Sequence, residues 1–412
     1  MALVAVMGCG GGSGAAPGAV ATGWTGADAG ADGSFRPAPH APLPRVITLG
    51  GAVLTAPKVL PIVYAGDTGA AYVQSFLGEL AQSAVWAQVT AEYGIGPLTV
   101  LPAVTMTTAA PRTIADGTLQ SVLAANTTGV SPPWGAADPQ TIYLFLLPQG
   151  TVEQDGDGSC CTDFDGYHAE ARAGSTSLPY AVTCACPGFD GPSVTLTQER
   201  TIAVSHELYE AATDPLPFTN PAYEQEDADD AVWTLVTDGE IADMCEFNDD
   251  ANVVPVGSTY MVQRSWSNAA AARGDNPCVP SVSSTPYLNS FPALGPITDN
   301  TAAAGLKTQG LNIPLGGKKT IALTLSSAAP TDKTWTVSAY DYDTAVAASA
   351  MPGLALSLDK SAGRNGDVIH LTVTPKHANA KLGGEAFMIV SDYGNPGDPD
   401  FESQLTMGLV TN

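Results

Sequence analysis

The chain has 412 residues, a net charge of −25 and an ordinary share of apolar residues, 44%. This length accommodates two domains and a leader, and because no run of about 20 apolar residues occurs, no membrane-spanning helix is expected. Residues 1–280 carry 8 basic and 30 acidic side chains, whereas residues 281–412 carry 8 and 11. Such a surface repels nucleic acid and anionic lipid, which excludes nucleic acid as a partner, and it favours cations and basic substrates.

The first nine residues end in Leu3-Val-Ala-Val-Met-Gly-Cys9, followed by a Gly/Ser stretch. This pattern resembles the lipobox of bacterial lipoproteins, so residues 1–9 are predicted to be a truncated signal peptide. An ordinary secretory leader is the alternative. Either leader exports the chain, to the bacterial cell surface, the outer membrane or the medium, and a lipid on Cys9 would be its one membrane contact. Residues 10–44, rich in Gly, Ala and Pro, are predicted to be a disordered tether.

Residues 45–281 are predicted to form an α/β domain. Its expected order is strand, strand, helix, strand, helix, strand, which indicates a mixed α/β layer. The last of these strands is the continuous apolar run Thr141–Leu147, typical of a central strand buried on both faces. The expected ranges are Val46–Leu54, Val59–Tyr64, Ala70–Tyr93, Leu98–Thr105, Thr118–Ala125 and Thr141–Leu147.

An aspartate-rich loop follows, with Asp155, Asp157, Asp163 and Asp165. It is a partial match to a calcium loop, and a polar loop carrying disulfides is an equal alternative. Export leaves six cysteines in a compartment that permits disulfides. The simplest pairing joins Cys160 and Cys161 to Cys184 and Cys186 in either combination, and Cys245 to Cys278. The predicted strand Pro179–Cys186 is offered as a partner for an extended substrate.

The most informative stretch is Thr201–Pro215, which is predicted to be a helix that ends at a proline. His206, Glu210 and Asp214 recur every four residues and therefore share one face. His206-Glu207-x-x-Glu210 differs by one letter from the zinc-peptidase motif H-E-x-x-H, in which the first and last residues bind zinc and the Glu is the general base. Because a carboxylate replaces the second His, the ligand atoms of the predicted site are harder than those of two histidines. This makes calcium a more credible ion than it would be for H-E-x-x-H. A capped helix with a solvated polar face is the alternative without a metal.

Two further segments complete the chain. Residues 224–250 hold eleven acidic and no basic side chains, and they include Asp238-Gly-Glu240-Ile-Ala-Asp243. From residue 282 onward, short alternating strands separated by turn residues predict an all-β sandwich of immunoglobulin-like type, an accessory or adhesion module without chemistry of its own.

Residues 45–280 resemble the EXORDIUM-like, or phosphate-induced, protein family of plants and its bacterial relatives. The resemblance rests on ordered blocks: Gly50-Gly-Ala-Val-Leu, Gly166-Tyr-His168, Leu178-Pro-Tyr-Ala181, Ser205-His-Glu-Leu-Tyr-Glu210, Thr213-Asp-Pro-Leu216, Glu240-Ile-Ala-Asp243-Met-Cys245 and Trp266-Ser-Asn268. It implies a secreted, disulfide-bonded α/β domain associated with cell walls, and no reaction is securely attached to the family.

The segment Gly239-Glu-Ile-Ala-Asp243 is also similar to the downstream motif of gluzincin peptidases. That likeness implies Glu240 as the third zinc ligand and Asp243 as the partner that orients His206, although the shorter spacing leaves the two interchangeable. Asp214 is a further candidate ligand, or a helix cap. His168 or Tyr209 would stabilise the oxyanion.

Three functions follow as alternatives. The first is a zincin-like metal-dependent hydrolase, a zinc peptidase in which Glu207 accepts the proton of the attacking water. The second is a non-catalytic extracellular binding or adhesion protein in which calcium or a polar network replaces zinc. The third is a glycosidase that uses Glu207 and Glu240, which leaves His206 without a role. The expected partner is a peptide or a cell-wall polymer, and the chain is expected to be a monomer.

Overall fold

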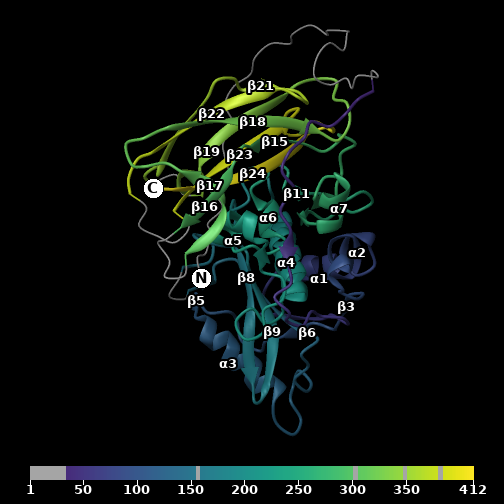
Figure 1. Cartoon of the computed structure of the whole chain (residues 1–412). Helices are drawn as coiled ribbons and strands as arrows, with labels where there is room; N and C mark the ends of the chain where they lie inside the picture. The colour runs from purple at the N-terminus through teal and green to yellow at the C-terminus, as the bar shows by residue number, and fades with distance from the viewer. Residues whose placement is uncertain (1–33, 155–157, 300–304, 347–349, 379–383) are drawn as a thin grey trace.

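The apolar run Thr141–Leu147 forms β6, the central strand of a mixed sheet in the lower half of Figure 1. The strand order is β3-β2-β6-β9-β8, with β4 also paired to β2. All neighbours are parallel except the last pair, in which β8 runs antiparallel to β9. The other bounds are β2 Lys58–Val63, β3 Thr99–Val100, β4 Val104–Thr105, β8 Gly166–Ala173 and β9 Thr176–Cys184.

Side chains of β6 alternate between two hydrophobic clusters, as expected for a strand covered on both faces. Ile142, Leu144 and Leu146 pack with the helices α1, α2 and α4. Tyr143 and Phe145 point to the other face, which is covered by α3. The sheet is therefore the middle of three layers, which confirms the predicted mixed α/β layer. The helices are α1 Ala70–Leu80, α2 Ala84–Thr90, α3 Asp116–Thr127 and α4 Leu196–Thr213.

Helix α4 carries the predicted motif and begins earlier than the motif indicated. Thr195 caps it, since the Thr195 hydroxyl accepts from the Gln198 backbone N–H while the Gln198 side chain accepts from the Thr195 backbone N–H. The helix is buried along most of its length and packs against β9 and β8. The capping box and the sheet together fix how α4 presents its polar side chains.

This computed structural model describes residues 34–154, 158–299, 305–346, 350–378 and 384–412. The predictions for Cys9, Asp155 and Asp157 lie outside the described residues. Within them, the single helix expected over Ala70–Tyr93 divides into α1, α2 and a 3-10 turn, because Ser83 caps a new helix. No helix of the described chain is long and apolar enough to cross a membrane.

Three disulfides join Cys160 to Cys184, Cys161 to Cys186 and Cys245 to Cys278. The pairing agrees with the simplest one that the spacing allowed, and the structure resolves the ambiguity between the adjacent cysteines. The first two bridges tie the aspartate-rich loop to the end of β9, and the third ties α6 to β14. Three bridges are consistent with an extracellular protein.

Two stacked sheets form the upper half of Figure 1. The first has the order β15-β18-β22-β20 and the second β16-β17-β24-β23-β19-β21. Their bounds are β15 Leu288–Pro292, β16 Gly295–Asp299, β17 Leu306–Asn312, β18 Lys319–Ser327, β19 Trp335–Asp341, β20 Leu354–Leu358, β21 Ala362–Gly363, β22 Val368–Pro375, β23 Glu385–Tyr393 and β24 Glu402–Thr411. Trp335, Phe387 and Ile389 lie in the core between the sheets. We call this half the sandwich.

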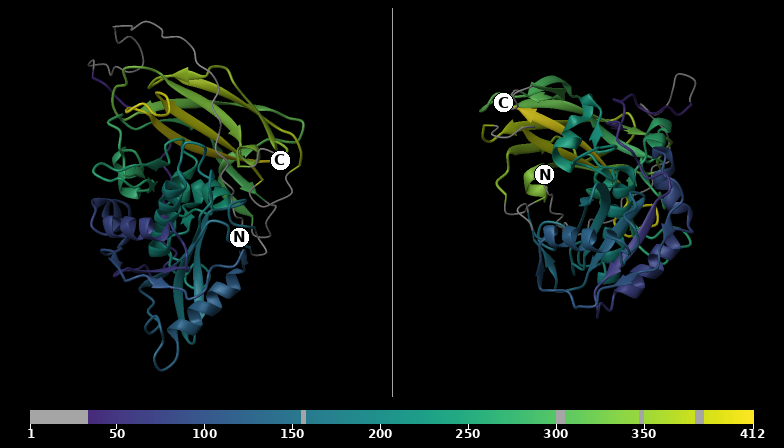
Figure 2. Two further views of the ribbon diagram at one scale, coloured as in Figure 1. Left: turned by 180° about the vertical axis from the view of Figure 1, so that it is seen from behind. Right: turned by 90° about the horizontal axis from the view of Figure 1, so that it is seen from below.

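The sandwich and the α/β half share a hydrophobic cluster. Alternate residues of β23, Ala386, Met388 and Val390, leave the sandwich core and join the main hydrophobic cluster of the α/β half. Strand β23 is covered on both faces, which agrees with the continuous apolar run Ala386–Val390. Figure 2 shows the helices between the two halves. The remaining helices are α5 Ala231–Thr237, α6 Asp243–Glu246, α7 Asn268–Arg273 and α8 Tyr342–Val346.

Polar contacts also join the two halves. Arg264 is fully buried, and its guanidinium contacts Asp250 from its own half and Glu402 from β24, the latter at 3.3 Å. The Arg264 Nε donates to the Cys278 carbonyl. Tyr342 of α8 donates to the Val236 carbonyl. These contacts fix the sandwich against the acidic segment 224–250.

The described end of the expected tether is not disordered. Asn365 of the sandwich accepts from the Ala38 N–H and donates to the Arg36 carbonyl, and the His40 ring stacks on Phe291 at 3.9 Å between centroids. Residues 34–44 therefore lie along the sandwich, held by backbone hydrogen bonds that composition does not indicate.

Short ribbons close the α/β half, and one of them carries a buried carboxylate. The pairs are β1 Val46–Ile47 with β10 Gln225–Glu226, β5 Thr113–Ile114 with β7 Val152–Glu153, β11 Asn252–Val253 with β12 Val262–Gln263, and β13 Ser265–Trp266 with β14 Cys278–Val279. The 3-10 turns span Ala91–Tyr93 and Ala228–Asp230.

Glu226 is fully buried and accepts from the Thr234 hydroxyl at 2.6 Å. Burial raises the pKa of Glu226 to about 7.

Replacing Glu226 by Gln is expected to stabilise the protein at pH 8 by up to about 3 kcal/mol and to have little effect near pH 4.5. The folded-state pKa lies above the unfolded one, so the Glu226 contribution is present at low pH and is lost as pH rises from about 4.5 to 7. Urea unfolding at the two pH values measures this difference. Glu92→Gln, an exposed carboxylate, is the matched control. An equal effect of Glu226→Gln at both pH values would contradict the assignment.

Candidate metal centre

The polar face of α4 opens onto a cavity of about 940 Å³ between the two halves. His206, Glu207 and Glu210 line it from α4, and Glu240 and Asp243 line it from the acidic segment. The sandwich closes one wall with residues of β19, α8 and β23: Tyr340, Thr344, Ala345, Met388 and Val390. The structure thus brings together two segments that are about 30 residues apart in sequence.

His206 is held with one ring nitrogen facing carboxylates. Its Nδ1 lies 2.8 Å from Gln263 Oε1, and Gln263 Nε2 donates to the Ala242 carbonyl at 2.9 Å. The carbonyl can only accept, so the Gln263 oxygen faces His206 and Nδ1 donates to it. The other nitrogen, Nε2, lies 3.0 Å from Glu210 Oε2 and 3.2 Å from Asp243 Oδ1. A ring nitrogen fixed in this way is the usual arrangement of a metal-binding histidine.

Glu210 is oriented from its other oxygen. Its Oε1 accepts from the backbone N–H groups of Ala242 and Asp243, at 3.0 and 3.3 Å. This leaves Oε2 free to face His206. Burial raises the pKa of Glu210, but the two histidines and the backbone N–H groups outweigh burial and hold it below its ordinary value. Glu210 is therefore an ionised acceptor within the cluster.

Glu207 lies on the same cavity wall, against β8. A side-chain carbon at Gly166 would stand 2.7 Å from Glu207 Oε1 and 2.9 Å from its Cγ, so Gly166 leaves the space that the Glu207 side chain fills. Burial raises the pKa of Glu207. A buried carboxylate with a raised pKa next to metal-binding side chains fits the predicted general base.

His168 also reaches the cluster, from β8. Its Nε2 lies 3.1 Å from the Asp214 carbonyl, which can only accept, so Nε2 carries a proton. Its Nδ1 lies 3.7 Å from Glu207 Oε2 and 3.8 Å from Glu210 Oε2. Glu240 Oε1 lies 3.3 Å from His168 Nε2. His168 was predicted only as an oxyanion stabiliser, and the structure places it among the carboxylates.

The two candidates that sequence left interchangeable now separate. Asp243 stands beside His206, and Glu240 stands beside His168. Three groups have ligand atoms close enough to share an ion: His206 with Glu207 and Glu210; His206 with Asp243 and Glu246; His168 with Glu210 and Glu240. Asp243 stands beside His206, as the peptidase likeness implied, but it faces Nε2, whereas Gln263 holds Nδ1.

Burial of the carboxylates dominates the electrostatics of the cluster, and repulsion between them adds to it. Burial and the neighbouring carboxylates raise the pKa of Glu240, Asp243 and Glu246 well above the ordinary range. Burial lowers the pKa of His206, but Glu210 and Asp243 outweigh it and raise the pKa well above its ordinary value. Without an added cation, the cluster is stable only if it retains protons.

Two predicted residues do not join the cluster, and one predicted strand has another role. Tyr209 is fully buried in the hydrophobic core against Trp86 and does not line the cavity, because it projects from the opposite face of α4. Asp214 is the C-cap residue of α4, because its backbone N–H donates to the Glu210 carbonyl, and its carboxylate accepts from the Ala222 N–H at 2.8 Å. Strand β9 lies between β6 and β8, so it has no edge for a substrate.

The structure describes two of the four aspartates of the aspartate-rich loop, Asp163 and Asp165. Asp163 accepts from the Ser159 N–H within the loop, whereas Asp165 lines the cavity near His206 and Glu207. Sequence reasoning missed Asp190, Glu246 and Gln263, which also line the cavity. The sequence does contain a signal for Glu246, because this residue lies in the same acidic segment, three residues after Asp243. Gln263 had none, because its role depends on the pairing of β12 with β11.

The ligand separations suit a divalent cation. Ligand atoms on one tetrahedral zinc ion are about 3.3 Å apart, and the distances from His206 Nε2 to its two carboxylates are 3.0 and 3.2 Å. One imidazole with carboxylates also suits calcium or manganese. The residues present therefore fit a metal ion, with His206, Glu210 and Asp243 as the nearest set.

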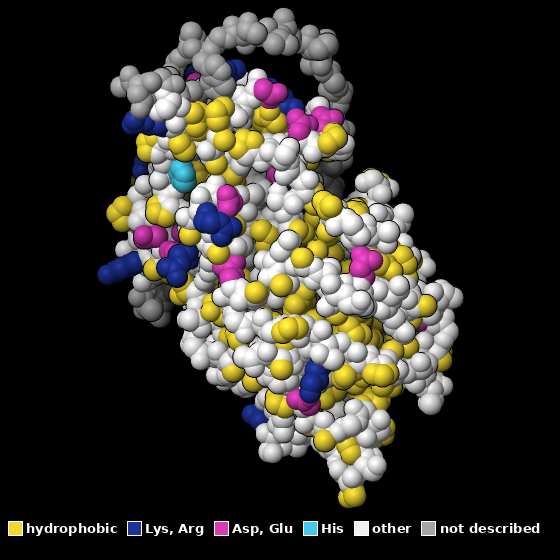
Figure 3. Space-filling view, turned by 90° about the vertical axis from the view of Figure 1, so that its right-hand side faces the viewer, with side chains coloured by type: hydrophobic (Ala, Val, Ile, Leu, Met, Phe, Trp, Pro, Cys, Tyr) yellow, Lys and Arg dark blue, Asp and Glu magenta, His cyan; other side chains and the backbone are white. Residues whose placement is uncertain are grey.

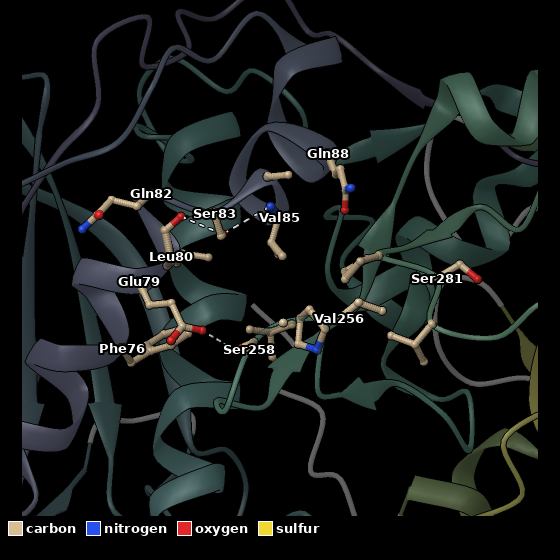
Figure 4. Close-up of a pocket in the computed structure, with 16 residues that line it drawn as sticks. Phe76, Glu79, Leu80, Gln82, Ser83, Val85, Gln88, Val256, Ser258 and Ser281 are labelled. Carbon is tan, nitrogen blue, oxygen red and sulfur yellow. Dashed lines mark hydrogen bonds between the residues drawn. The ribbon is translucent and has the colours of Figure 1, made fainter.

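A second cavity of about 460 Å³ lies between α1, α2 and the loops at residues 255–258 and 280–282 (Figure 4). Its one carboxylate, Glu79, accepts from Ser258, and no His or Cys lines it. On the face in Figure 3, acidic side chains are scattered and form no continuous patch. Neither feature competes with the cluster on α4 as a functional site.

Comparisons with known proteins leave the function open. No family model and no curated protein match this chain. Among solved structures, the chain is similar to the crystal structure of domains 4 and 5 of the S-layer protein SbsC, at 14% identity over 40% of this chain and 68% of that chain. The TM-score of 0.17 is too low to support an argument about fold or function. The resemblance to the EXORDIUM-like family remains a prediction.

Proposed function

We propose that this protein is an exported metal-dependent hydrolase, a peptidase of zincin type with an HExxE motif. The observation that supports it best is His206, which has Nδ1 held by Gln263 and Nε2 directed at Glu210 and Asp243. A mixed sheet with an antiparallel edge strand over the motif helix also favours the zincin-like fold. The immunoglobulin-like character of the sandwich and the lipid anchor at Cys9 belong to the same proposal.

Each residue has a role that follows from its place. His206, Glu210 and Asp243 hold the ion, with zinc the first choice and calcium the second. Bound zinc supplies acidification of a water molecule and polarisation of the substrate carbonyl. Glu207 accepts the proton of the attacking water and passes it to the leaving amine. His168 Nε2 donates to the Asp214 carbonyl and Nδ1 lies 3.7 Å from Glu207 Oε2, so His168 would donate to the oxyanion through Nδ1 as an imidazolium.

The lining of the cavity suggests a basic peptide as substrate. Nine carboxylates line it: Asp165, Asp190, Glu207, Glu210, Asp238, Glu240, Asp243, Glu246 and Asp249. No Lys or Arg of the described chain does so. A cationic side chain or amino terminus is therefore attracted. The sandwich wall, with Met388 and Val390, offers an apolar surface for a neighbouring side chain. Strand β8, at the sheet edge, is placed to pair with an extended peptide.

A peptide-library screen of the full chain tests this function. We expect cleavage next to Lys or Arg that stops when a chelator removes the metal and returns when zinc is added. Cleavage that persists in the presence of chelator would contradict the proposal. If no peptide is cleaved although the metal binds, the non-catalytic binding protein with a structural metal becomes the better account.

A further inference from the structure

The carboxylates and histidines divide into two complete ligand groups with no residue in common. One group contains His206, Asp243 and Glu246, and the other contains His168, Glu210 and Glu240. Each group has one imidazole and two carboxylates whose ligand atoms lie within 4.8 Å of one another. The contact of 3.0 Å between His206 Nε2 and Glu210 Oε2 joins the two groups.

The two imidazoles are held in the same way, which an acidic patch alone would not require. His206 donates Nδ1–H to Gln263, and His168 donates Nε2–H to the Asp214 carbonyl. The remaining nitrogen of His206 faces Glu210 and Asp243, and that of His168 faces Glu207 and Glu210. Glu240 Oε1 approaches His168 from the side of Nε2, at 3.3 Å, and belongs to the second group through the spacing of its ligand atoms. For His168 the separations from Nδ1, 3.7 and 3.8 Å, are too long for hydrogen bonds. They match the spacing of about 3 to 4 Å between two ligands of one divalent ion.

Glu210 lies between the two imidazoles. Its Oε2 is 3.0 Å from His206 Nε2 and 3.8 Å from His168 Nδ1, while Oε1 is occupied by two backbone N–H groups. A carboxylate that bridges two metal ions is arranged in this way, with one oxygen facing the imidazole ligands of both ions. Two-metal sites hold their ions about 3.5 to 4 Å apart, which one bridging group can span.

The net charge of the cluster also favours two divalent ions over one. The two groups and Glu207 contribute five carboxylates, of which Glu207 and Glu210 are buried and the other three are partly buried. With two neutral imidazoles, one divalent ion leaves a charge of −3 and two leave −1. No Lys or Arg side chain among the cavity residues that the structure describes compensates the rest. Buried charge without compensation is costly.

We propose that the cavity holds two divalent cations, one at His206, Asp243 and Glu246 and a second at His168 and Glu240, with Glu210 bridging them. This inference deepens the proposed function and rests on it. The second cation changes the role of His168, which becomes a ligand through Nδ1 instead of a donor to the oxyanion. Glu207 stays between the two ions as the base.

Metal stoichiometry of the full chain tests the second site. The protein is loaded with zinc, dialysed and measured by elemental mass spectrometry, beside His168→Gln, Glu240→Gln and the surface control His370→Gln. We expect two zinc ions per chain in the wild type and the control, and one in each of the other two variants. Manganese loading adds a second measurement, because a spin-coupled pair is expected in the wild-type electron paramagnetic resonance spectrum and isolated ions in His168→Gln.

The outcomes separate this inference from the proposed function. One zinc ion in the wild type and in both site variants, with uncoupled manganese, would overturn the second site and leave a mononuclear hydrolase standing. No zinc in any protein would overturn both. Circular dichroism confirms folding of each variant, and Glu240→Gln provides the stoichiometry if His168→Gln does not fold.

Discussion

Glu207→Gln is expected to lower kcat for peptide cleavage by roughly 10²- to 10⁴-fold while the bound metal is retained. Glu207 lies beside the ligand cluster, but the nearest contacts of His206 Nε2 are Glu210 and Asp243. Gln has the same shape and fits the space that Gly166 leaves, yet it cannot accept a proton. Steady-state kinetics together with elemental analysis measure both consequences.

Glu170→Gln is the matched control for this result. Glu170 lies on β8, two residues from His168, but it does not line the cavity and instead accepts from Thr219. We expect its kcat to equal that of the wild type. A fully active Glu207→Gln protein would remove the general base from the mechanism, whereas loss of metal in that variant would reassign Glu207 as a ligand.

Arg264→Ala is expected to destabilise the protein by about 3 to 5 kcal/mol, because it leaves buried carboxylates without a partner. Arg264 is fully buried and contacts both Asp250 and Glu402, which belong to different halves of the molecule. Burial already raises the pKa of Glu402 to about 7, so this carboxylate can take up a proton in acid. The loss should therefore be larger at pH 8 than at pH 5.

Denaturant unfolding at both pH values measures this effect. Lys333→Ala is the control, since Lys333 forms an exposed pair with Asp400 at 2.8 Å, and exposed pairs contribute at most about 1 kcal/mol. Similar losses in the two variants would show that Arg264 does not stabilise the contact between the halves. A loss at pH 8 restricted to Arg264→Ala supports a single cooperative unit.

The sequence was sufficient to predict the features whose signal lies in neighbouring residues. The apolar run Thr141–Leu147 predicted a strand buried on both faces, and the four-residue spacing of His206 and Glu210 predicted one helical face. The simplest pairing of the six cysteines left only the choice between the adjacent Cys160 and Cys161 open. These signals depend on neighbouring residues, so tertiary packing did not alter them.

The parts of the candidate site and of the fold that the sequence did not predict depend on contacts between distant segments. The approach of His168 to Glu207 and Glu210 follows from the position of β8 beside α4, which no spacing indicates. Gln263 reaches His206 because β12 pairs with β11. The run at Ala386–Val390 could have predicted a strand of the sandwich covered on both faces, but it could not name the surface that covers it.

Zinc content of the purified full chain, compared with that of His206→Gln, tests the central claim most directly. The full chain is required, because removal of the sandwich would expose the apolar surface of the α/β half that Met388 and Val390 cover. We predict at least one tightly bound zinc ion per chain in the wild type, and loss of at least one ion in the variant. Equal zinc content in the two proteins, or none in either, would contradict a metal centre at His206.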